Sequence, residues 1–138
     1  MILSKFKSGK RPSYRELDKK LTEVRSLIRD QRWLPAEVSK LKANFDSLEQ
    51  RFGVDTTTTE DQTTLLLKAA QEVTPDDYAG ARPPQEAYEH EIKGEDLFAF
   101  RWKSVSFGNV DMYFKFCLKG TDKGRKAYIC SIHEHKEK

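Results

Sequence analysis

Residues 97–135 read LFAFRWKSVSFGNVDMYFKFCLKGTDKGRKAYICSIHEH, and this stretch decides the fold. It holds eight of the fifteen aromatic residues of the chain, both cysteines and two of the three histidines. Apolar and polar residues alternate along it, which is the pattern of a strand with one buried face. We therefore expect a sheet here, against which the rest of the chain packs.

Two turns divide this stretch into three strands. Gly108-Asn109 is typical of the first turn. At the second turn we expect a three-residue loop, with a type I turn over Asp122 and Lys123 and with Gly124 in the left-handed region as a bulge. Such a loop pairs, on an apolar face, Leu118 with Tyr128, Phe116 with Cys130 and Phe114 with Ile132. On the other face it pairs Cys117 with Ile129, Lys115 with Ser131 and Tyr113 with His133.

The residues before the sheet are expected to be mainly helical. A first helix starts at Ser13, which forms a capping box with Glu16, and its apolar stripe ends near Trp33. A second helix runs from Pro35 to Gly53, and the very short connection between the two predicts an antiparallel helical hairpin.

A third helix is expected over residues 60–72, after a cap at Thr59. The sequence Thr74-Pro75 then starts a short helical turn. The tandem Pro83-Pro84 marks a loop that crosses to the sheet. The predicted fold is a single α+β domain over residues 1–138, with helices at 13–78 packed on a three-stranded antiparallel sheet at 97–135. Residues 79–96 connect the two layers.

Composition narrows the class of protein. A chain of 138 residues is a common size for one domain. No apolar run approaches the roughly 18 residues of a membrane span, and the first residues lack the apolar core of a signal peptide. We expect a cytoplasmic protein whose two cysteines are reduced.

The charges are unevenly distributed along the chain. Residues 1–34 carry ten Lys and Arg against four Asp and Glu, residues 35–96 carry six against fourteen, and residues 97–138 carry nine against four. Basic ends around an acidic middle favour a surface that binds phosphate groups. The alternative is ordinary solvated surface charge.

The polar face of the predicted sheet gathers side chains suited to RNA chemistry. It presents Arg101, Lys103, Tyr113, Lys115, Ser131 and His133. Cleavage of RNA without a metal needs a base, an acid and fixed cations near the phosphate. An imidazole changes charge near neutral pH, so His133 is the candidate acid or base, and Tyr113 can stack a base. The alternative is a solvent-facing sheet that carries cations for solubility.

A zinc site is the other chemistry that the stretch raises. His133 and His135 share a strand face, but Cys130 is predicted on the apolar face and Cys117 lacks a C-x-x-C partner. We therefore expect no metal or other cofactor, and interpret the thiols as small core residues.

Four stretches resemble the MqsR-type toxins of the RelE superfamily, which are mRNA interferases of bacterial type II toxin–antitoxin systems. QEVTPDDYAG at residues 71–80 is similar to the family's Leu-x-x-x-Asp-Phe-Tyr pattern, and GEDLFAFR at 94–101 to its Gln-Asp-Val-Tyr pattern. VDMYFKF at 110–116 resembles the strand that carries its tyrosine, and CSIHEHKEK at 130–138 its terminal Ser-Phe-Lys-Glu. The likeness covers about half of the chain.

The resemblance implies a RelE-like fold and assigns roles to residues. Tyr113 stands at the family's catalytic tyrosine, His133 at its C-terminal catalytic lysine and Glu95 at its catalytic glutamine. Ala79 replaces another lysine, with Arg82 the nearest cation. RelE-like relatives also end in a catalytic histidine or tyrosine, so His133 keeps the function possible.

These observations predict a metal-independent endoribonuclease toxin that cleaves single-stranded mRNA by 2′-OH attack, either free or on the ribosome, with a cognate antitoxin as partner. The expected catalytic residues are His133, Tyr113, Glu95 and Lys115, and the expected RNA contacts are Arg101, Lys103, Ser131 and Arg82. The alternative is a non-catalytic regulatory or adaptor module that binds protein or nucleic acid. That module would meet a partner through its helical hairpin and leave Tyr14, Leu17 and Trp33 partly exposed.

Overall fold

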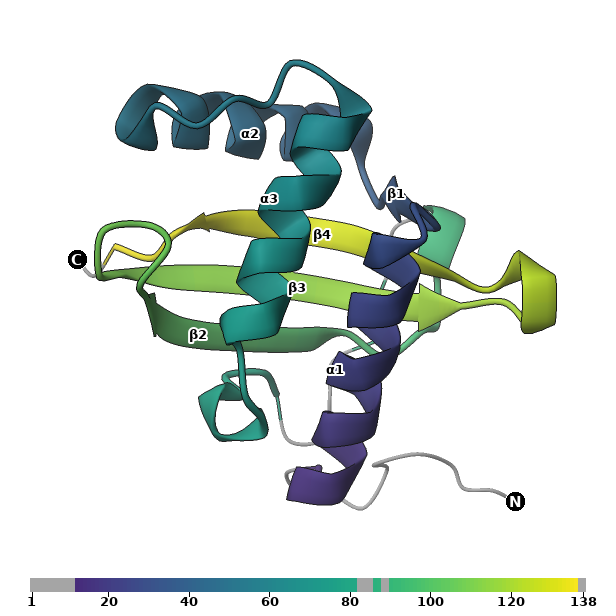
Figure 1. Cartoon of the computed structure of the whole chain (residues 1–138). Helices are drawn as coiled ribbons and strands as arrows, with labels where there is room; N and C mark the ends of the chain where they lie inside the picture. The colour runs from purple at the N-terminus through teal and green to yellow at the C-terminus, as the bar shows by residue number, and fades with distance from the viewer. Residues whose placement is uncertain (1–11, 82–85, 88–89, 137–138) are drawn as a thin grey trace.

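The computed structural model describes residues 12–81, 86–87 and 90–136. They form an α+β fold in which helices cover one face and one edge of a sheet (Figure 1). The described part of the sheet has four strands in the order β1-β4-β3-β2, which are Trp33–Pro35, Lys126–Glu134, Val110–Lys119 and Phe98–Ser104. The expected α+β class is thus confirmed, whereas the expectation of three strands is wrong. No helix among the described residues is long and apolar enough to cross a membrane.

Two helices pack on the same face of the sheet, where they cross its strands (Figure 1). Helix α1 spans Tyr14–Arg29, and its capping box between Ser13 and Glu16 is formed as predicted. Helix α3 spans Thr59–Glu72 and is capped by Thr58 with Asp61, one residue earlier than expected. Arg25 of α1 joins the two helices by donating to the last carbonyl groups around α3, Ala70 O at 2.8 Å and Val73 O at 2.7 Å. The short helical turn predicted after α3 is also present, over Pro75–Asp77.

The fourth strand is β1, Trp33–Pro35, which pairs in parallel with Ala127, Tyr128 and Ile129 of β4. The sequence prediction placed here the end of the first helix, the connection and, at Pro35, the start of the second helix; that helix begins at Val38 instead. The indole of Trp33 is buried and donates to Thr63 Oγ1 at 2.9 Å, which fixes the segment beneath α3. Because this strand separates α1 from α2, the two helices do not form the predicted hairpin.

Helix α2, Val38–Phe52, lies along the edge of the sheet beside β4, Lys126–Glu134 (Figure 1). It buries Leu41, Phe45 and Leu48 and ends at Gly53, which adopts the predicted left-handed conformation with φ 71°. Asn44 Oδ1 accepts the backbone N–H of Ile132 at 2.8 Å. This side chain therefore satisfies a strand-edge amide beyond the reach of β1.

Strands β2, Phe98–Ser104, and β3, Val110–Lys119, form an antiparallel hairpin. Its turn contains Gly108 and Asn109, as the sequence predicts, and both residues have positive φ. The core face carries large aromatic residues, among them Phe100, Phe114 and Phe116, which are fully buried beneath the helices. The expected aromatic core of the sheet is confirmed.

The β3–β4 connection differs from the predicted loop. It is longer, it holds a 3-10 turn at Asp122–Gly124, and the residues at positive φ are Gly120 and Asp122 instead of Gly124. Near the loop the register is therefore one residue away from the prediction, with Leu118 opposite Ala127 and Phe116 opposite Ile129. A bulge at Cys130 restores the predicted pairs of Phe114 with Ile132, Lys115 with Ser131 and Tyr113 with His133.

The second face of the sheet is only partly open. Cys117 and Cys130 are buried there in a small cluster with Ala36, Ala87, Ile92 and Leu97. The predicted place of Cys130 on the aromatic face is wrong, because the bulge turns it to the other side. The thiols do lie in apolar surroundings, and the covered half of this face leaves the Tyr113 end as the accessible part.

Candidate functional site

A row of three side-by-side residues crosses the open end of the second face. Arg101 of β2 pairs with Tyr113 of β3, and Tyr113 pairs with His133 of β4. Strand alternation turns all three away from the aromatic core, since their neighbours Trp102, Phe114 and Ile132 are buried in it. We call Arg101, Lys103, Tyr113, Lys115 and His133 the basic face. The structure thus brings together five of the residues selected from the sequence.

A second row lies beside the first. Lys115 is partly exposed, between Ala99 on one side and Ser131 on the other. Ser131 is only 2% exposed, so the prediction that it contacts RNA is not supported by its position. Exposed Ala79 borders the row, because its N–H donates to Ala99 O at 2.8 Å. The position at which the family resemblance expects a lysine is therefore close to the basic face.

The rings of Tyr113 and His133 are stacked. Their centroids are 5.2 Å apart with an angle of 29° between the ring planes, and His135 lies farther off at 6.4 Å. Nδ1 of His133 lies 2.9 Å from the carbonyl oxygen of Glu134. A carbonyl oxygen can only accept, so Nδ1 is the donor in this contact, and in the neutral form of the imidazole the lone pair is then on Nε2. The imidazole is oriented with one basic nitrogen available.

The surroundings of Tyr113 raise the pKa of its phenol. Burial raises the pKa of its phenol above the ordinary value of 10.0, and the nearby Cys130 sulfur raises the pKa further. Arg101 is held in place by Asp111, whose Oδ2 lies 3.2 Å from the guanidinium. The backbone of Asp111 also accepts the N–H of His135 at 2.8 Å. The site therefore combines a protonated hydroxyl, an imidazole and a fixed cation.

One of the sequence-selected residues that the structure describes lies away from this arrangement. Glu95 lies three residues before β2 and raises the pKa of Arg125, so its carboxylate is near the β3–β4 loop at the other end of the sheet. The residue that faces Tyr113 from β2 is Arg101. Arg82 lies outside the described residues. The expectation that Glu95 acts beside Tyr113 is therefore not met by its position.

Asp111 and His135 are residues that the sequence prediction missed as parts of this site. Residues two apart along a strand lie on the same face of the sheet. Asp111 precedes Tyr113 by two residues and His135 follows His133 by two, so this spacing could have indicated both. Within the part of the chain that the structure describes, no group of three or more His, Cys, Asp or Glu side chains is placed to hold a metal ion. Cys130 and Cys117 are buried in an apolar cluster instead.

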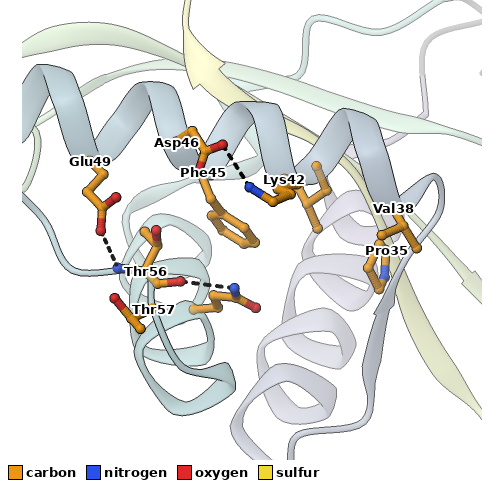
Figure 2. Close-up of a pocket in the computed structure, with 10 residues that line it drawn as sticks. Pro35, Val38, Lys42, Phe45, Asp46, Glu49, Thr56 and Thr57 are labelled. Atoms are coloured by element: carbon orange, nitrogen blue, oxygen red, sulfur yellow. Dashed lines mark hydrogen bonds and ion pairs between the residues drawn. The ribbon is translucent and has the colours of Figure 1, made fainter.

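A separate groove lies between β1, α2 and the loop before α3, and Figure 2 shows its lining. Its polar groups bind one another. Lys42 pairs with Asp46 at 3.1 Å, and Gln62 Nε2 donates to Thr56 O at 3.0 Å. None of the sequence-selected residues lines this groove. The basic face remains the better candidate for chemistry.

Comparisons with known proteins do not identify the chain. No family model matches it, and neither the curated proteins nor the solved structures compared with it include a match. Function is therefore argued from the site itself.

Proposed function

We propose that the protein is a metal-independent endoribonuclease that cleaves single-stranded RNA at the basic face. The observation that carries the proposal is the row Arg101, Tyr113 and His133, in which a cation, a phenol and an imidazole lie side by side. RNA supplies its own nucleophile, the 2′-OH, so the enzyme needs only proton transfer and charge stabilisation. All three groups for these tasks are present in the row.

Each residue has a distinct task in the proposed reaction. His133 Nε2 takes the proton of the 2′-OH, whose oxygen attacks the adjacent phosphorus and forms a 2′,3′-cyclic phosphate. Tyr113 gives its proton to the departing 5′ oxygen, since a phenol, with an ordinary pKa of about 10, is protonated at neutral pH. Arg101 and Lys115 stabilise the negative charge that develops on the phosphate oxygens. Lys103 contacts the sugar-phosphate backbone of the RNA beside the cleaved bond.

The resemblance to the MqsR-type toxins supports the biological setting of the proposal. The positions that it selects at Ala79, Tyr113 and His133 fall on or beside the basic face. We therefore extend the proposal to a RelE-like mRNA interferase that acts in the cytoplasm. Its partner would be an antitoxin that covers the basic face, and its substrate is mRNA either free or on the ribosome.

The adaptor alternative expects Tyr14, Leu17 and Trp33 to be partly exposed. Tyr14 is 57% exposed, but Leu17 is fully buried and Trp33 is only 8% exposed. Two of the three side chains that would meet a partner are therefore committed to the core.

The proposal is tested by incubating the purified protein with single-stranded RNA in EDTA. We expect cleavage with 2′,3′-cyclic phosphate ends, slowed by about a hundredfold or more in His133→Ala and Tyr113→Phe. Lys42→Ala, a change on the far side of α2, serves as the control and should cleave normally. Absence of cleavage, or equal rates for all variants, would contradict the proposal.

A further inference from the structure

A groove that shares His133 with the basic face lies at the edge of the sheet. It has a volume of about 390 Å³ and lies between the second half of α2 and the end of β4. Gln50, Arg51 and Phe52 line it from α2, and His133, Glu134 and Lys136 line it from the end of the chain. His133 therefore belongs both to the proposed catalytic row and to this groove.

The groove exists because β4 extends beyond the end of β1, its neighbour at the edge of the sheet. The short strand β1 pairs only with Ala127–Ile129, so among the described residues no strand continues the sheet beside Ser131–Glu134. Helix α2 takes that place and is fixed there by Asn44, which accepts the Ile132 N–H. A helix covers a strand edge less closely than another strand does, and this leaves an open channel next to His133.

The side chains of the groove suit a phosphate and a base. Arg51 Nε donates to Glu134 Oε1 at 3.1 Å, and the Arg51 side chain is 53% exposed. A guanidinium has five N–H donors, so this contact leaves others able to bind phosphate oxygens. The guanidinium carbon of Arg51 lies 4.9 Å from the centre of the Phe52 ring, and Lys136 is exposed nearby. Guanidinium planes and aromatic rings are the surfaces on which unpaired bases stack.

We infer that this groove binds the nucleotide next to the scissile phosphate of a single-stranded RNA. Arg51 and Lys136 contact its phosphate, and Gln50 and the Arg51–Phe52 pair contact its base. The volume is near the lower end of the range for small-ligand sites, which suits one nucleotide. The inference rests on the proposed function, because the position of the strand is set by His133.

The test measures binding of a 2′-O-methyl octanucleotide, which lacks the attacking hydroxyl and cannot be cleaved. Fluorescence anisotropy is recorded over a range of salt concentrations. Loss of one phosphate contact with a single strand lowers the slope of log K against log salt by about 0.7, which corresponds to about fivefold weaker binding near 0.1 M salt. We expect this result for Arg51→Gln and for Lys136→Gln.

Two matched variants separate a local contact from a general charge effect. Lys42→Gln removes the same charge from the same helix, from a side chain that is 73% exposed in the other groove, and should leave the slope unchanged. Glu134→Gln removes the negative charge beside Arg51 and should tighten binding. Circular dichroism confirms that each variant is folded.

The outcomes distinguish the two proposals. Three results would overturn the groove as an RNA subsite. They are equal effects of Arg51→Gln and Lys42→Gln, weaker binding by Glu134→Gln, and no binding by the wild-type protein. Wild-type binding of the methylated strand without cleavage of the same unmodified RNA would overturn the catalytic proposal and leave the subsite standing.

Discussion

The ring of Tyr113 stacks on the imidazole of His133 with 5.2 Å between the ring centroids. The two residues face each other across neighbouring antiparallel strands. Cross-strand partners on one face hold their side chains within about 4.5–5.5 Å at Cβ. The backbone of the sheet therefore keeps the phenol ring and the imidazole side by side, without the help of a loop.

The titration of the Tyr113 phenol makes the free energy of unfolding depend on pH in the alkaline range. Burial raises its pKa in the folded state above 10.0, so the unfolded chain releases this proton first as pH rises. The associated stability is fully present below about pH 10 and is lost as pH rises further toward the folded-state pKa. Urea unfolding between neutral pH and pH 11 should show this loss in the wild type and a smaller loss in Tyr113→Phe. Tyr14→Phe, at an exposed position, should behave like the wild type.

Glu72 locks the end of α3 to the β2–β3 hairpin. Its carboxylate accepts from Trp102 Nε1 at 2.8 Å, from Ser104 Oγ at 2.5 Å and from the N–H and hydroxyl of Ser106 at 2.8 and 2.6 Å. Burial would raise the pKa of Glu72, but these hydrogen bonds together hold it below the ordinary 4.5. The stability that they supply is present above about pH 4.5 and is lost as pH falls through the folded-state pKa.

We therefore expect Glu72→Gln to lower the free energy of unfolding at neutral pH by about 1–3 kcal/mol, because an amide cannot accept from all of these donors. The variant should also lose part of the acid dependence of the wild type. Asp76→Asn, an exposed carboxylate nearby in sequence, is the control and should change neither quantity. Equal stability of wild type and Glu72→Gln in urea titrations would contradict the expectation.

Asn44 is expected to act as a positioning residue for His133. It satisfies the N–H of Ile132, the residue directly before His133. Asn44→Ala leaves that amide without its acceptor and should cost about 1 kcal/mol in stability. Hydrogen exchange at the Ile132 amide should accelerate, and kcat for RNA should fall more than KM changes. Asn44→Asp keeps an acceptor at the same place and should restore both the slow hydrogen exchange of the Ile132 amide and kcat. If it restores neither, Asn44 is not a positioning residue for His133.

The helices and the aromatic strands could be predicted because their signals are local. The capping box of Ser13 with Glu16 and the alternation around Phe114 depend on neighbouring residues alone. Strand β1 could not be predicted in this way. Three residues are too few to show alternation, and its partner is β4, far along the chain.

The pairing of Tyr113 with His133 was predicted from a loop that the structure does not have. The pair Tyr113 and His133 requires the observed register, which arises from a longer loop and a compensating bulge at Cys130. Neither has a strong sequence signal, because the bulged residue is not a glycine. Strand parity was sufficient to select Arg101 and Lys115. Glu95 was selected from motif likeness alone, and the length of the β2–β3 hairpin places Arg101 opposite Tyr113 instead.

The β3–β4 loop gives a direct test of structure against the sequence prediction. Gly120 has φ +99°, a conformation that favours glycine, and a Cβ there would overlap the carbonyl oxygen of Gly124. A Cβ on Gly124 would meet no atom within 4 Å, and this glycine is not at positive φ. Gly120→Ala should therefore lower the free energy of unfolding by about 1–3 kcal/mol, whereas Gly124→Ala should change it by less than about 0.5 kcal/mol. The loop predicted from the sequence places Gly124 in the left-handed region and requires the opposite order, so urea unfolding of the two variants decides between the two loops.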